Sequence, residues 1–597
     1  MDPGNPVDSQ AVAHRLASVY DQPEHPASAR VVRGAAWIAA AYNEPGLWLM
    51  GGALLIALGM VTVLLGYIAI EGLLAFWPRE VVSLQLETGE VVCGEIVRSE
   101  RYVPEKQALN ELPEVLKERA FQAIRQQGAV RRYLVRIGNY ELTGEHFRWV
   151  SEFEIAGASR NLPSDIAVFE RRAWGRFYGF PAAFVVDGKI VAEGVAQVWQ
   201  EFERAHPQVL SLWGELRRLE RVDLGRINRR MEEARLSCRE VELRYGEDSA
   251  EADEARRRWQ AEQAALEAQA ATVEAKITKL REEIGRWAIQ VKTADGKEAS
   301  LPVGEIVRAY LPNRLNWWGK FRVYLARLWE FVSDEPREAN SEGGVFPAIF
   351  GTVLMTLLMA LGVAPFGVVA AIYLREYAKA GLVVSAVRIA VNNLAGVPSI
   401  VFGVFGLGFF CYTVGASIDQ LFYAARLPSP TFGSGGILWA SLTLALLTLP
   451  VVIVATEEAL AAVPNSVREG SLACGATKWQ TIRRVVLPQA MPGVLTGMIL
   501  AMARGAGEVA PLMLVGVVKL APELPVDGEF PFFHPERSFM HLGFHIYDLG
   551  FQSQNAEAAR PMVFATALLL VLIIFTLNLA AIYLRARLRR RFLGARF

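Results

Sequence analysis

The amino-acid sequence predicts an α-helical polytopic membrane protein with about six spans and one inserted domain of mixed α and β structure. Three observations predict this fold class. Long uncharged stretches recur along the 597 residues, of which 52% are hydrophobic. The segment 77–344 interrupts them and is rich in charged residues. Within that segment, two runs repeat apolar residues at the alternating steps of three and four that are typical of a coiled coil.

Six stretches reach the roughly 20 apolar residues that a helix needs to cross a hydrocarbon layer. They are Leu47–Leu74, Phe346–Leu374, Ala395–Ile418, Ile437–Thr456, Met491–Val518 and Pro561–Leu584. The first is too long, and lies too far from the start, for a cleaved signal peptide. We therefore expect a retained first transmembrane helix over 47–76 and five further spans within 345–597.

The composition argues against several classes of function. The 62 basic and 62 acidic residues balance, so no overall charge favours nucleic acid as a partner. The four cysteines stand at positions 93, 238, 411 and 474 without C-x-x-C spacing. Neither a disulfide framework nor a metal site is therefore expected.

Charge near the last span predicts the orientation. Six arginines follow it closely: Arg585, Arg587, Arg589, Arg590, Arg591 and Arg596. Because positive charge beside a span tends to stay in the cytoplasm, we expect a cytoplasmic C-terminus. Six crossings then place the N-terminal segment 1–46 in the cytoplasm and the insert 77–344 on the outer side.

The insert is predicted to have a β-rich base, formed by 77–202 and 288–312. Strand-like runs cover Val81–Arg98, Val130–Ile137 and Ala183–Val198. The five residues Gly94–Arg98 recur as Gly304–Arg308, which suggests that the two runs pair in one small β-domain. A helix over 315–332 carries several tryptophans, which favour the membrane boundary.

Between the two parts of the base, 203–287 is predicted to form an antiparallel coiled-coil hairpin. Core positions follow each other at heptad steps: Ile227, Met231, Ala234, Cys238, Val241 and Tyr245, then Leu266, Ala270, Val273, Ile277, Leu280, Ile284 and Trp287. Gly246 can end the first arm and Ser249 can begin the second. Cys238 on this seam favours a packed thiol over a reactive one.

The loop 457–488, after the fourth span, contains two short capped helices. Pro464 bends the chain, and Ser466 with Glu469 has the spacing of a capping box that opens a helix at Val467. Gly475 is placed to end that helix in a left-handed turn. Thr477 and Gln480 give a second capping box. Two short helices with defined caps and a glycine between them favour a rigid structure that binds a partner.

This loop resembles the EAA motif of ABC-importer permeases, in which the loop supplies a coupling helix to a separate ATPase. The matching positions are Ser466, Arg468, Glu469, Gly470, Gly475, Ala476, Thr477, Lys478, Leu487 and Pro488. Gly470 and Ser471 stand where the family usually has alanine. The chain has no G-x-x-x-x-G-K-[ST] phosphate loop, so we expect a transport subunit that is not itself an enzyme.

A nearer resemblance is to the phosphate-specific ABC permeases of the PstA type. Three runs carry it: Asn392–Gly403, Val467–Lys478 and Ala503–Glu508. Together the matches cover about 343–587. The resemblance implies a type I ABC importer permease fold in 345–597 and a multi-pass protein of the bacterial inner membrane. It also implies four partners: the lipid bilayer, an ATPase dimer that binds ATP and Mg, a PstC-type second permease and an extracytoplasmic phosphate-binding protein.

Two charged residues interrupt the fifth predicted span. Arg504 and Glu508 are four residues apart, which predicts one face of one helix. Buried charge in a membrane is expensive, so both should face the bundle interior or a wet cavity. The family pattern favours a phosphate path in which Arg504 meets the substrate, while a structural ion pair between helices is the alternative. Asn392 and Asn393 are likewise candidates for the path or for helix packing.

A different class of function competes with transport. Some ABC-type membrane proteins use an outer coiled coil to regulate an envelope partner, so the predicted hairpin allows a mechanotransmission or signalling role.

Overall fold

The computed structural model describes residues 45–593 apart from 106–108, 110–111, 338–339 and 554–555. The chain divides into two compact units, Met1–Ile70 and Glu71–Phe597. The predicted cytoplasmic segment 1–46 falls almost wholly outside the described residues. The first described element is helix α3, Pro45–Leu74, whose apolar side chains are exposed along most of its length.

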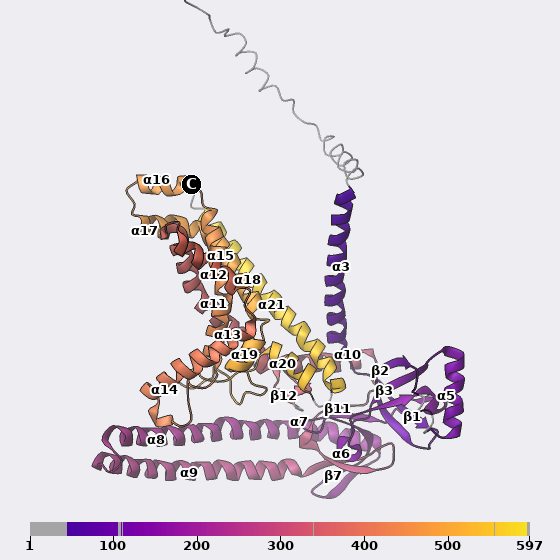
Figure 1. Cartoon of the computed structure of the whole chain (residues 1–597). Coiled ribbons are helices and arrows are strands. Elements are labelled where there is room, and N and C mark those ends of the chain that lie inside the picture. The colour runs from indigo at the N-terminus through magenta and orange to yellow at the C-terminus, as the bar shows by residue number, and fades with distance from the viewer. Residues whose placement is uncertain (1–44, 106–108, 110–111, 338–339, 554–555, 594–597) are drawn as a thin grey trace, which may run out of the picture. The chain divides into compact units, whose positions relative to one another are not determined.

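Six helices of the described chain are long and apolar enough to cross a membrane, as predicted (Figure 1). They cover Trp48–Leu74, Phe346–Tyr377, Ser399–Phe422, Ile437–Ala461, Lys478–Gly505 and Ala556–Arg587. Three of them share a buried core: α11 (Phe346–Ile372), α15 (Ile437–Ala461) and α18 (Leu487–Gly505). Small residues allow the close approach, since a Cβ added at Gly497 would lie 2.5 Å from the Cβ of Ala455.

Two predicted spans are displaced along the chain in the structure, whereas the other four differ only at their ends. The third begins at Ser399 rather than at Ala395, because Pro398 disfavours helical backbone at the residue before it. It runs through α13 (Ser399–Phe405), a π-helical stretch (Gly406–Gly415) and α14 (Ala416–Phe422). The fifth begins at Lys478 and ends at Gly505, and α19 (Ala510–Val515) follows after a break. Pro511 explains the break, because its ring would clash with a carbonyl four residues earlier in a continuous helix.

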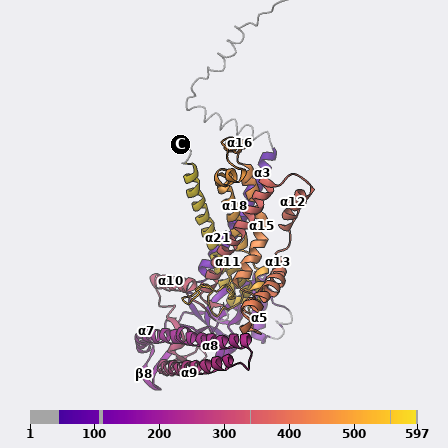
Figure 2. The same ribbon diagram turned by 90° about the vertical axis from the view of Figure 1, so that its left-hand side faces the viewer.

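The remaining helices of the core are short or terminal. They are α12 (Leu382–Leu394), α16 (Asn465–Ala473), α17 (Lys478–Thr481), α20 (Leu542–Tyr547) and α21 (Ala556–Leu593). In both views α16 lies at one end of α15 and α13 lies toward the other end (Figures 1 and 2).

The segment 77–344 is built on two antiparallel sheets. The first has the strand order β4-β3-β2-β1-β5. Its strands are β1 (Val81–Leu86), β2 (Val91–Tyr102), β3 (Val130–Arg136), β4 (Phe147–Ser151) and β5 (Ile155–Asn161), with α5 (Glu114–Gln127) between β2 and β3 and the single turn α6 (Tyr140–Thr143) after β3. Buried Val82, Leu84, Val135 and Val150 form its core.

The second sheet has the order β10-β9-β7-β6-β11, and β8 pairs with β7. Its strands are β6 (Ala167–Arg171), β7 (Arg176–Val186), β8 (Lys189–Glu193), β9 (Trp287–Lys292), β10 (Glu298–Pro302) and β11 (Ile306–Tyr310). The expected pairing of Gly94–Arg98 with Gly304–Arg308 is wrong, because β2 pairs with β1 and β3 whereas β11 pairs with β6. The turn at Thr88–Gly89 joins β1 to β2, and so short a loop costs little entropy to close.

Two long antiparallel helical arms leave the second sheet and return to it. The first arm is α7 (Val195–Arg218), which continues through a π-helical turn into α8 (Leu224–Tyr245), and the second is α9 (Ala250–Gly285). The arm therefore begins at Val195, before the predicted 203, and the predicted strand over Ala183–Val198 ends at Glu193. Gly194, with a φ of +82°, separates β8 from α7.

Helices α8 and α9 lie side by side in both views (Figures 1 and 2), and part of the predicted heptad seam is buried between them. Trp287, predicted on this seam, instead begins β9. The buried members of the seam are Ile227, Ala234 and Cys238 on α8, with Leu266 and Ala270 on α9. Ser249 accepts a hydrogen bond from the N–H of Ala252 (3.1 Å) and so caps α9. Tyr245 is 56% exposed, contrary to its expected core position, whereas Ala252 in the first turn of α9 is fully buried.

Helix α10, Trp317–Ser333, covers the predicted boundary helix 315–332. Asn316 caps it by accepting a hydrogen bond from the N–H of Gly319 (2.8 Å). Trp317, Trp318 and Trp329 are exposed, while Arg327 and Glu330 are buried on the opposite face. The short pair β12 (Pro336–Arg337) and β13 (Glu342–Gly343) then leads into α11.

Candidate functional site

The residues Asn465–Val486, here called the loop segment, connect α15 to α18. Helix α16 ends before Gly475, whose φ of +82° is left-handed as predicted. The predicted capping box at Thr477 is confirmed: Thr477 Oγ1 accepts from the N–H of Gln480 (3.3 Å), and Gln480 Oε1 accepts from the N–H of Thr477 (2.9 Å). Helix α17 then passes through a π-helical turn, Ile482–Val486, into α18.

The capping box predicted at Ser466 and Glu469 is wrong. Helix α16 already begins at Asn465, and Pro464 occupies the cap position without a side-chain hydrogen bond. Proline sets the backbone angle that a helix start needs, so the chain turns without a serine cap. Ser466 and Glu469 are consequently free to lie on the exposed side of the helix.

Arg468 ties the loop segment to two long helices. Its guanidinium donates to the carbonyls of Leu460 (2.7 Å) and Val463, at the C-terminal end of α15. It also donates to Glu376 Oε1 (2.9 Å), in the π-helical stretch that follows α11. The two side chains of this ion pair are 16% and 10% exposed. A cation there satisfies the last carbonyls of α15 and complements the helix dipole.

Apolar packing reinforces this attachment. Val463, Ile482 and Val486 are buried in one cluster with Ile372 of α11 and Leu460 of α15. Two polar contacts close the loop segment on itself and on the end of α11: Ser471 Oγ lies 3.0 Å from Thr481 Oγ1, and Lys478 Nζ lies 4.8 Å from the ring centre of Tyr377. The loop segment is thus held as one body on α11 and α15.

The loop segment turns one face to the outside. This exposed face comprises Glu469, Gly470, Leu472, Cys474 and Trp479. Leu472 is 48% exposed and Trp479 is 53% exposed, so this face offers apolar surface outside the membrane-spanning helices. Of the other predicted residues, Ala476 is half-buried. Leu487 and Pro488 form the first turn of α18 and do not belong to this face.

Arg504 and Glu508 do not share a helix face, contrary to the prediction. Arg504 lies in the last turn of α18, and Glu508 lies in the break before α19. The pair still forms, with Nε of Arg504 3.5 Å from Oε1 of Glu508, and the side chains are 37% and 21% exposed. The charges therefore sit where the backbone itself is interrupted, an arrangement that membrane proteins use where a segment lines a cavity or meets protein.

Asn392 and Asn393 lie near the end of α12 and are exposed. Among the described residues, no hydrogen bond or ion pair joins them to Arg504 or Glu508. Helix α12 instead packs through Val384 and Val391 against the ends of α11 and α15. The path role of the asparagines stays a prediction.

Sequence reasoning missed Glu376 in this region. Glu376 pairs with Arg468 across 92 positions, a separation that no local pattern reveals. His541 is buried and accepts from the N–H of Gly543 (3.1 Å). Burial lowers the pKa of His541 to about 4, so its ring is neutral at ordinary pH. In the part of the chain that the structure describes, no cluster of His, Cys, Asp and Glu could hold a metal ion.

Comparison of the sequence with known proteins identifies relatives of this chain. The family described as "binding-protein-dependent transport system inner membrane component" matches residues 364–592. Phosphate transport system permease protein PstA 1 of Mycobacterium tuberculosis is 35% identical over 249 residues, which are 42% of this chain and 73% of that protein. The probable ABC transporter permease protein YqgI of Bacillus subtilis is 28% identical over 43% of this chain and 82% of its own length.

A further relative extends this group. Phosphate transport system permease protein PstA of Mycobacterium leprae is 40% identical over 29% of this chain and 52% of that protein. The family match and the six apolar helices agree with a type I ABC importer permease fold. These relatives give no support to the mechanotransmission alternative.

Proposed function

Because the chain belongs to the family of PstA-type phosphate transport permeases, we propose that it forms one membrane-spanning half of an ATP-driven phosphate importer. ATP hydrolysis belongs to a separate ATPase, which binds ATP and Mg. A PstC-type permease completes the translocation path, and an extracytoplasmic binding protein delivers phosphate. The chain is a multi-pass inner-membrane protein with cytoplasmic termini and with 77–344 on the outer side.

The observation that carries the proposal is the braced loop segment with its exposed face. A docking element has to transmit force without deforming. Arg468 and the cluster around Val486 join the loop segment to α11 and α15, so a displacement of its exposed face moves both helices. The half-exposed Leu472 and Trp479 supply apolar surface that a groove on the ATPase would cover.

The interrupted fifth span supplies the substrate contact in this proposal. Arg504 offers a planar fork of N–H donors that matches phosphate oxygens, and Glu508 orients the fork through its 3.5 Å contact. The partner permease faces the exposed side of this pair. Asn392 and Asn393 are assigned to the cytoplasmic end of the same path.

The test is reconstitution of the four-component complex in liposomes, followed by uptake of radiolabelled phosphate. We expect saturable uptake that requires ATP on the loop-segment side and that unlabelled phosphate inhibits better than sulfate. A complex that hydrolyses ATP in response to the binding protein but accumulates a different solute, with phosphate ignored, would overturn the substrate assignment.

A further inference from the structure

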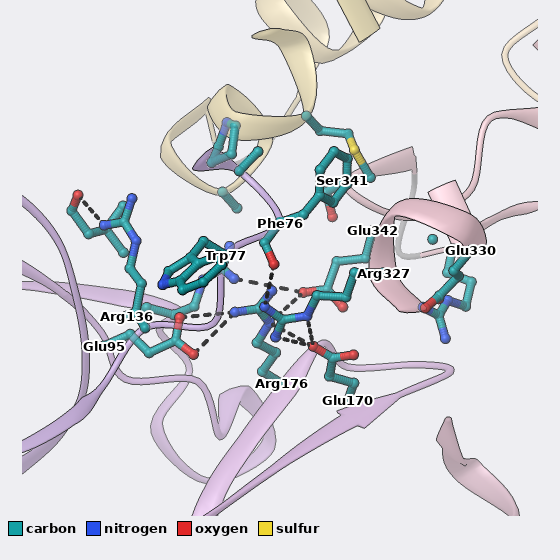
Figure 3. Close-up of a pocket in the computed structure, with 18 residues that line it drawn as sticks. Phe76, Trp77, Glu95, Arg136, Glu170, Arg176, Arg327, Glu330, Ser341 and Glu342 are labelled. Atoms are coloured by element: carbon teal, nitrogen blue, oxygen red, sulfur yellow. Dashed lines mark hydrogen bonds and ion pairs between the residues drawn. The ribbon is translucent and has the colours of Figure 1, made fainter. Parts of the chain in front are cut away.

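A small cavity in the second unit is surrounded by an excess of buried positive charge. It has a volume of about 100 Å³ and lies between the two sheets, α10 and the start of α21 (Figure 3). Its charged lining consists of Arg79, Arg136, Arg176, Arg327 and Arg337, with Glu95, Glu170, Glu330 and Glu342. Arg308 reaches the same carboxylates from β11. Six arginines therefore meet four glutamates.

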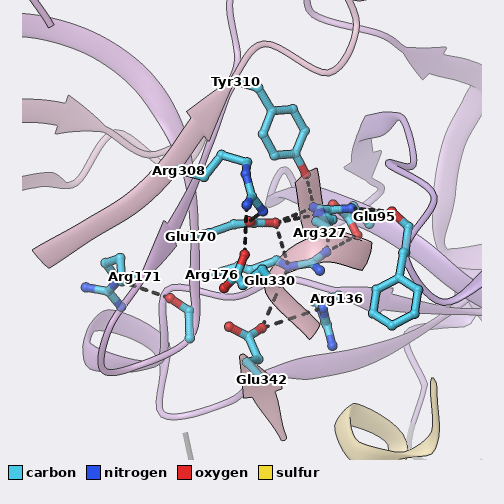
Figure 4. Close-up of polar contacts among 12 residues, drawn as sticks. Glu95, Arg136, Glu170, Arg171, Arg176, Arg308, Tyr310, Arg327, Glu330 and Glu342 are labelled. Atoms are coloured by element: carbon cyan, nitrogen blue, oxygen red, sulfur yellow. Dashed lines mark hydrogen bonds and ion pairs between the residues drawn. The ribbon is translucent and has the colours of Figure 1, made fainter. Parts of the chain in front are cut away.

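Two of the glutamates are fully committed to ion pairs on one side of the cavity (Figure 4). Glu170 pairs with Arg308 (2.7 Å) and with Arg327, and Glu330 pairs with Arg308 (2.7 Å) and with Arg337. Arg327 also donates to the hydroxyl of Tyr310 and to the carbonyl of Phe76. This half of the cluster is dense in charge-assisted hydrogen bonds, although Nε of Arg337 has no acceptor among the described residues.

The other half is short of negative charge. Arg176 has one close partner, Glu95 (2.9 Å), while Glu342 and Glu170 lie 3.7 Å and 3.9 Å from its Nε, and Glu342 lies 4.0 Å from Arg136. Arg79 donates only to the carbonyls of Ile96 (2.9 Å) and Val97 (2.6 Å), and among the described residues it forms no ion pair. Glu95 is therefore the one carboxylate within 3 Å of these three guanidinium groups among the described residues.

One buried donor in this half also lacks a hydrogen bond. Nε of Arg176 is inaccessible to solvent and has no hydrogen-bond acceptor among the described residues. Buried donors in folded proteins are nearly always satisfied, so an unsatisfied one indicates a missing acceptor. Arginine does not remove this donor by losing its proton, and a buried donor without an acceptor is costly.

The arginines influence one another electrostatically. Burial lowers the pKa of Arg79, and Arg136 and Arg176 lower it further, while Glu95 and Glu71 oppose the shift. The pKa of Arg176 is raised above its ordinary value, because nearby groups, Glu95 first, outweigh the effect of burial. A purely structural ion network would be expected to balance its charges. The excess here, next to an enclosed space, matches a site completed by a negatively charged ligand.

We propose that the space framed by Arg79, Arg136 and Arg176 is a binding site for a small tetrahedral oxyanion of the phosphate and sulfate class. The cavity exceeds the roughly 10–15 Å³ that one water needs, and it is too small for an organic ligand of ordinary size. Guanidinium forks fit such an anion bidentately. The site is separate from the Arg504–Glu508 pair in the interrupted span.

A second cavity provides access. It has a volume of about 850 Å³ and shares five lining residues with the small one: Arg136, Arg176, Ser341, Glu342 and Ala558. Its wall includes the stacked rings of Tyr140 and His146, 4.5 Å apart. An anion can therefore reach the arginines from the larger cavity. Because Arg327 donates to the carbonyl of Phe76 beside the site, an occupied site stabilises the contact between α10 and the segment that contains Phe76.

The experiment measures equilibrium binding of radiolabelled phosphate, and separately of sulfate, to the purified full chain in detergent. The expected result is saturable binding that Arg79→Gln weakens at least tenfold, because a charged hydrogen-bonding group is lost. Glu342→Gln removes a competing negative charge and should tighten binding several-fold. Arg98→Gln is the matched control: this arginine is 42% exposed, lies on β2 and does not line the cavity.

Further variants and a thermal measurement identify which site is responsible for the phosphate binding. Measured in an Arg504→Gln background, which removes the proposed transport-path contact, Arg79→Gln should still weaken phosphate binding at least tenfold. If Arg79→Gln fails to fold, Arg136→Gln takes its place, and a rise in the unfolding temperature with added oxyanion gives an independent readout. Absence of saturable binding, equal protection by chloride, or an Arg79→Gln variant with wild-type affinity would overturn the proposal. It does not rest on the proposed function, since binding is measured without ATP or partners.

Discussion

Replacing Arg468 by methionine should uncouple ATP hydrolysis from transport. The substitution keeps the length of the side chain and removes its donors to Leu460, Val463 and Glu376. The Glu376 carboxylate is then left nearly buried without its partner, and the last carbonyls of α15 lose their cap. The loop segment would keep its helices but lose its fixed orientation on α11 and α15.

The magnitude follows from the burial of the pair. Removing one partner of a fully buried ion pair costs about 3–5 kcal/mol. Since the two side chains retain 16% and 10% exposure, we take the lower end, about 3 kcal/mol. Each 1.4 kcal/mol is a factor of ten in an equilibrium constant. The ratio of correctly oriented to wrongly oriented loop segment should therefore fall roughly a hundredfold.

The assay is the number of phosphate ions taken up per ATP hydrolysed, in liposomes that contain the assembled complex. Arg468→Met should reduce this ratio at least tenfold while the complex still assembles. Glu376→Gln should do nearly as much, and the double variant should be little worse than either single variant. Arg375→Gln, at the exposed neighbouring position, is the control and should behave as wild type.

Additive effects in the double variant would refute this reasoning, because they would mean that Arg468 and Glu376 act independently. A wild-type ratio in Arg468→Met would refute it more directly. Loss of assembly, seen as failure to copurify with the ATPase, would assign the pair to docking rather than to orientation.

Four further outcomes are expected. Gly475→Ala should lower the unfolding temperature, since a left-handed residue other than glycine costs about 1 kcal/mol; an unchanged midpoint would contradict the turn. Arg504→Gln should abolish phosphate uptake in assembled complexes, and full uptake would exclude a path role. Ile277→Ala, in the core that joins α9 to the second sheet, should lower the free energy of unfolding by about 2–4 kcal/mol in a denaturant titration. Glu274→Ala, at an exposed position of the same helix, should leave it unchanged. Burial lowers the pKa of His541 and His545 to about 4. Their contribution to folding stability should therefore be complete above about pH 6.5 and be lost as the pH falls toward about 4. A melting temperature that stays constant across that window would contradict burial of the neutral rings.

The sequence was sufficient where the signal is local or periodic. Span lengths and heptad spacing depend on residues close together in the chain, and the six apolar helices and the buried Ile227 and Ile277 agree with them. The capping box at Thr477 needs only four residues, and the left-handed turn needs only Gly475.

Sequence reasoning failed where two local signals compete or where partners are distant. Ser466 has the spacing of a cap, but Pro464 starts the helix earlier. Hydropathy continued the fifth span through Gly505 and Gly507, whereas Pro511 breaks the helix. The pair of Arg468 with Glu376 and the arginine-rich cavity join residues from separate elements, and no spacing in one sequence predicts such contacts.

The docking of an ATPase on the exposed face of the loop segment is the central claim, and a native residue can report on it. Cys474 is exposed at the end of α16, whereas Cys238 and Cys411 are buried and Cys93 is only partly exposed. The measurement is the rate at which a maleimide reagent labels Cys474 in the isolated chain and in the assembled complex. If the ATPase covers the exposed face, labelling of Cys474 should be at least tenfold slower in the complex. Equal rates, in complexes that transport phosphate, would contradict it.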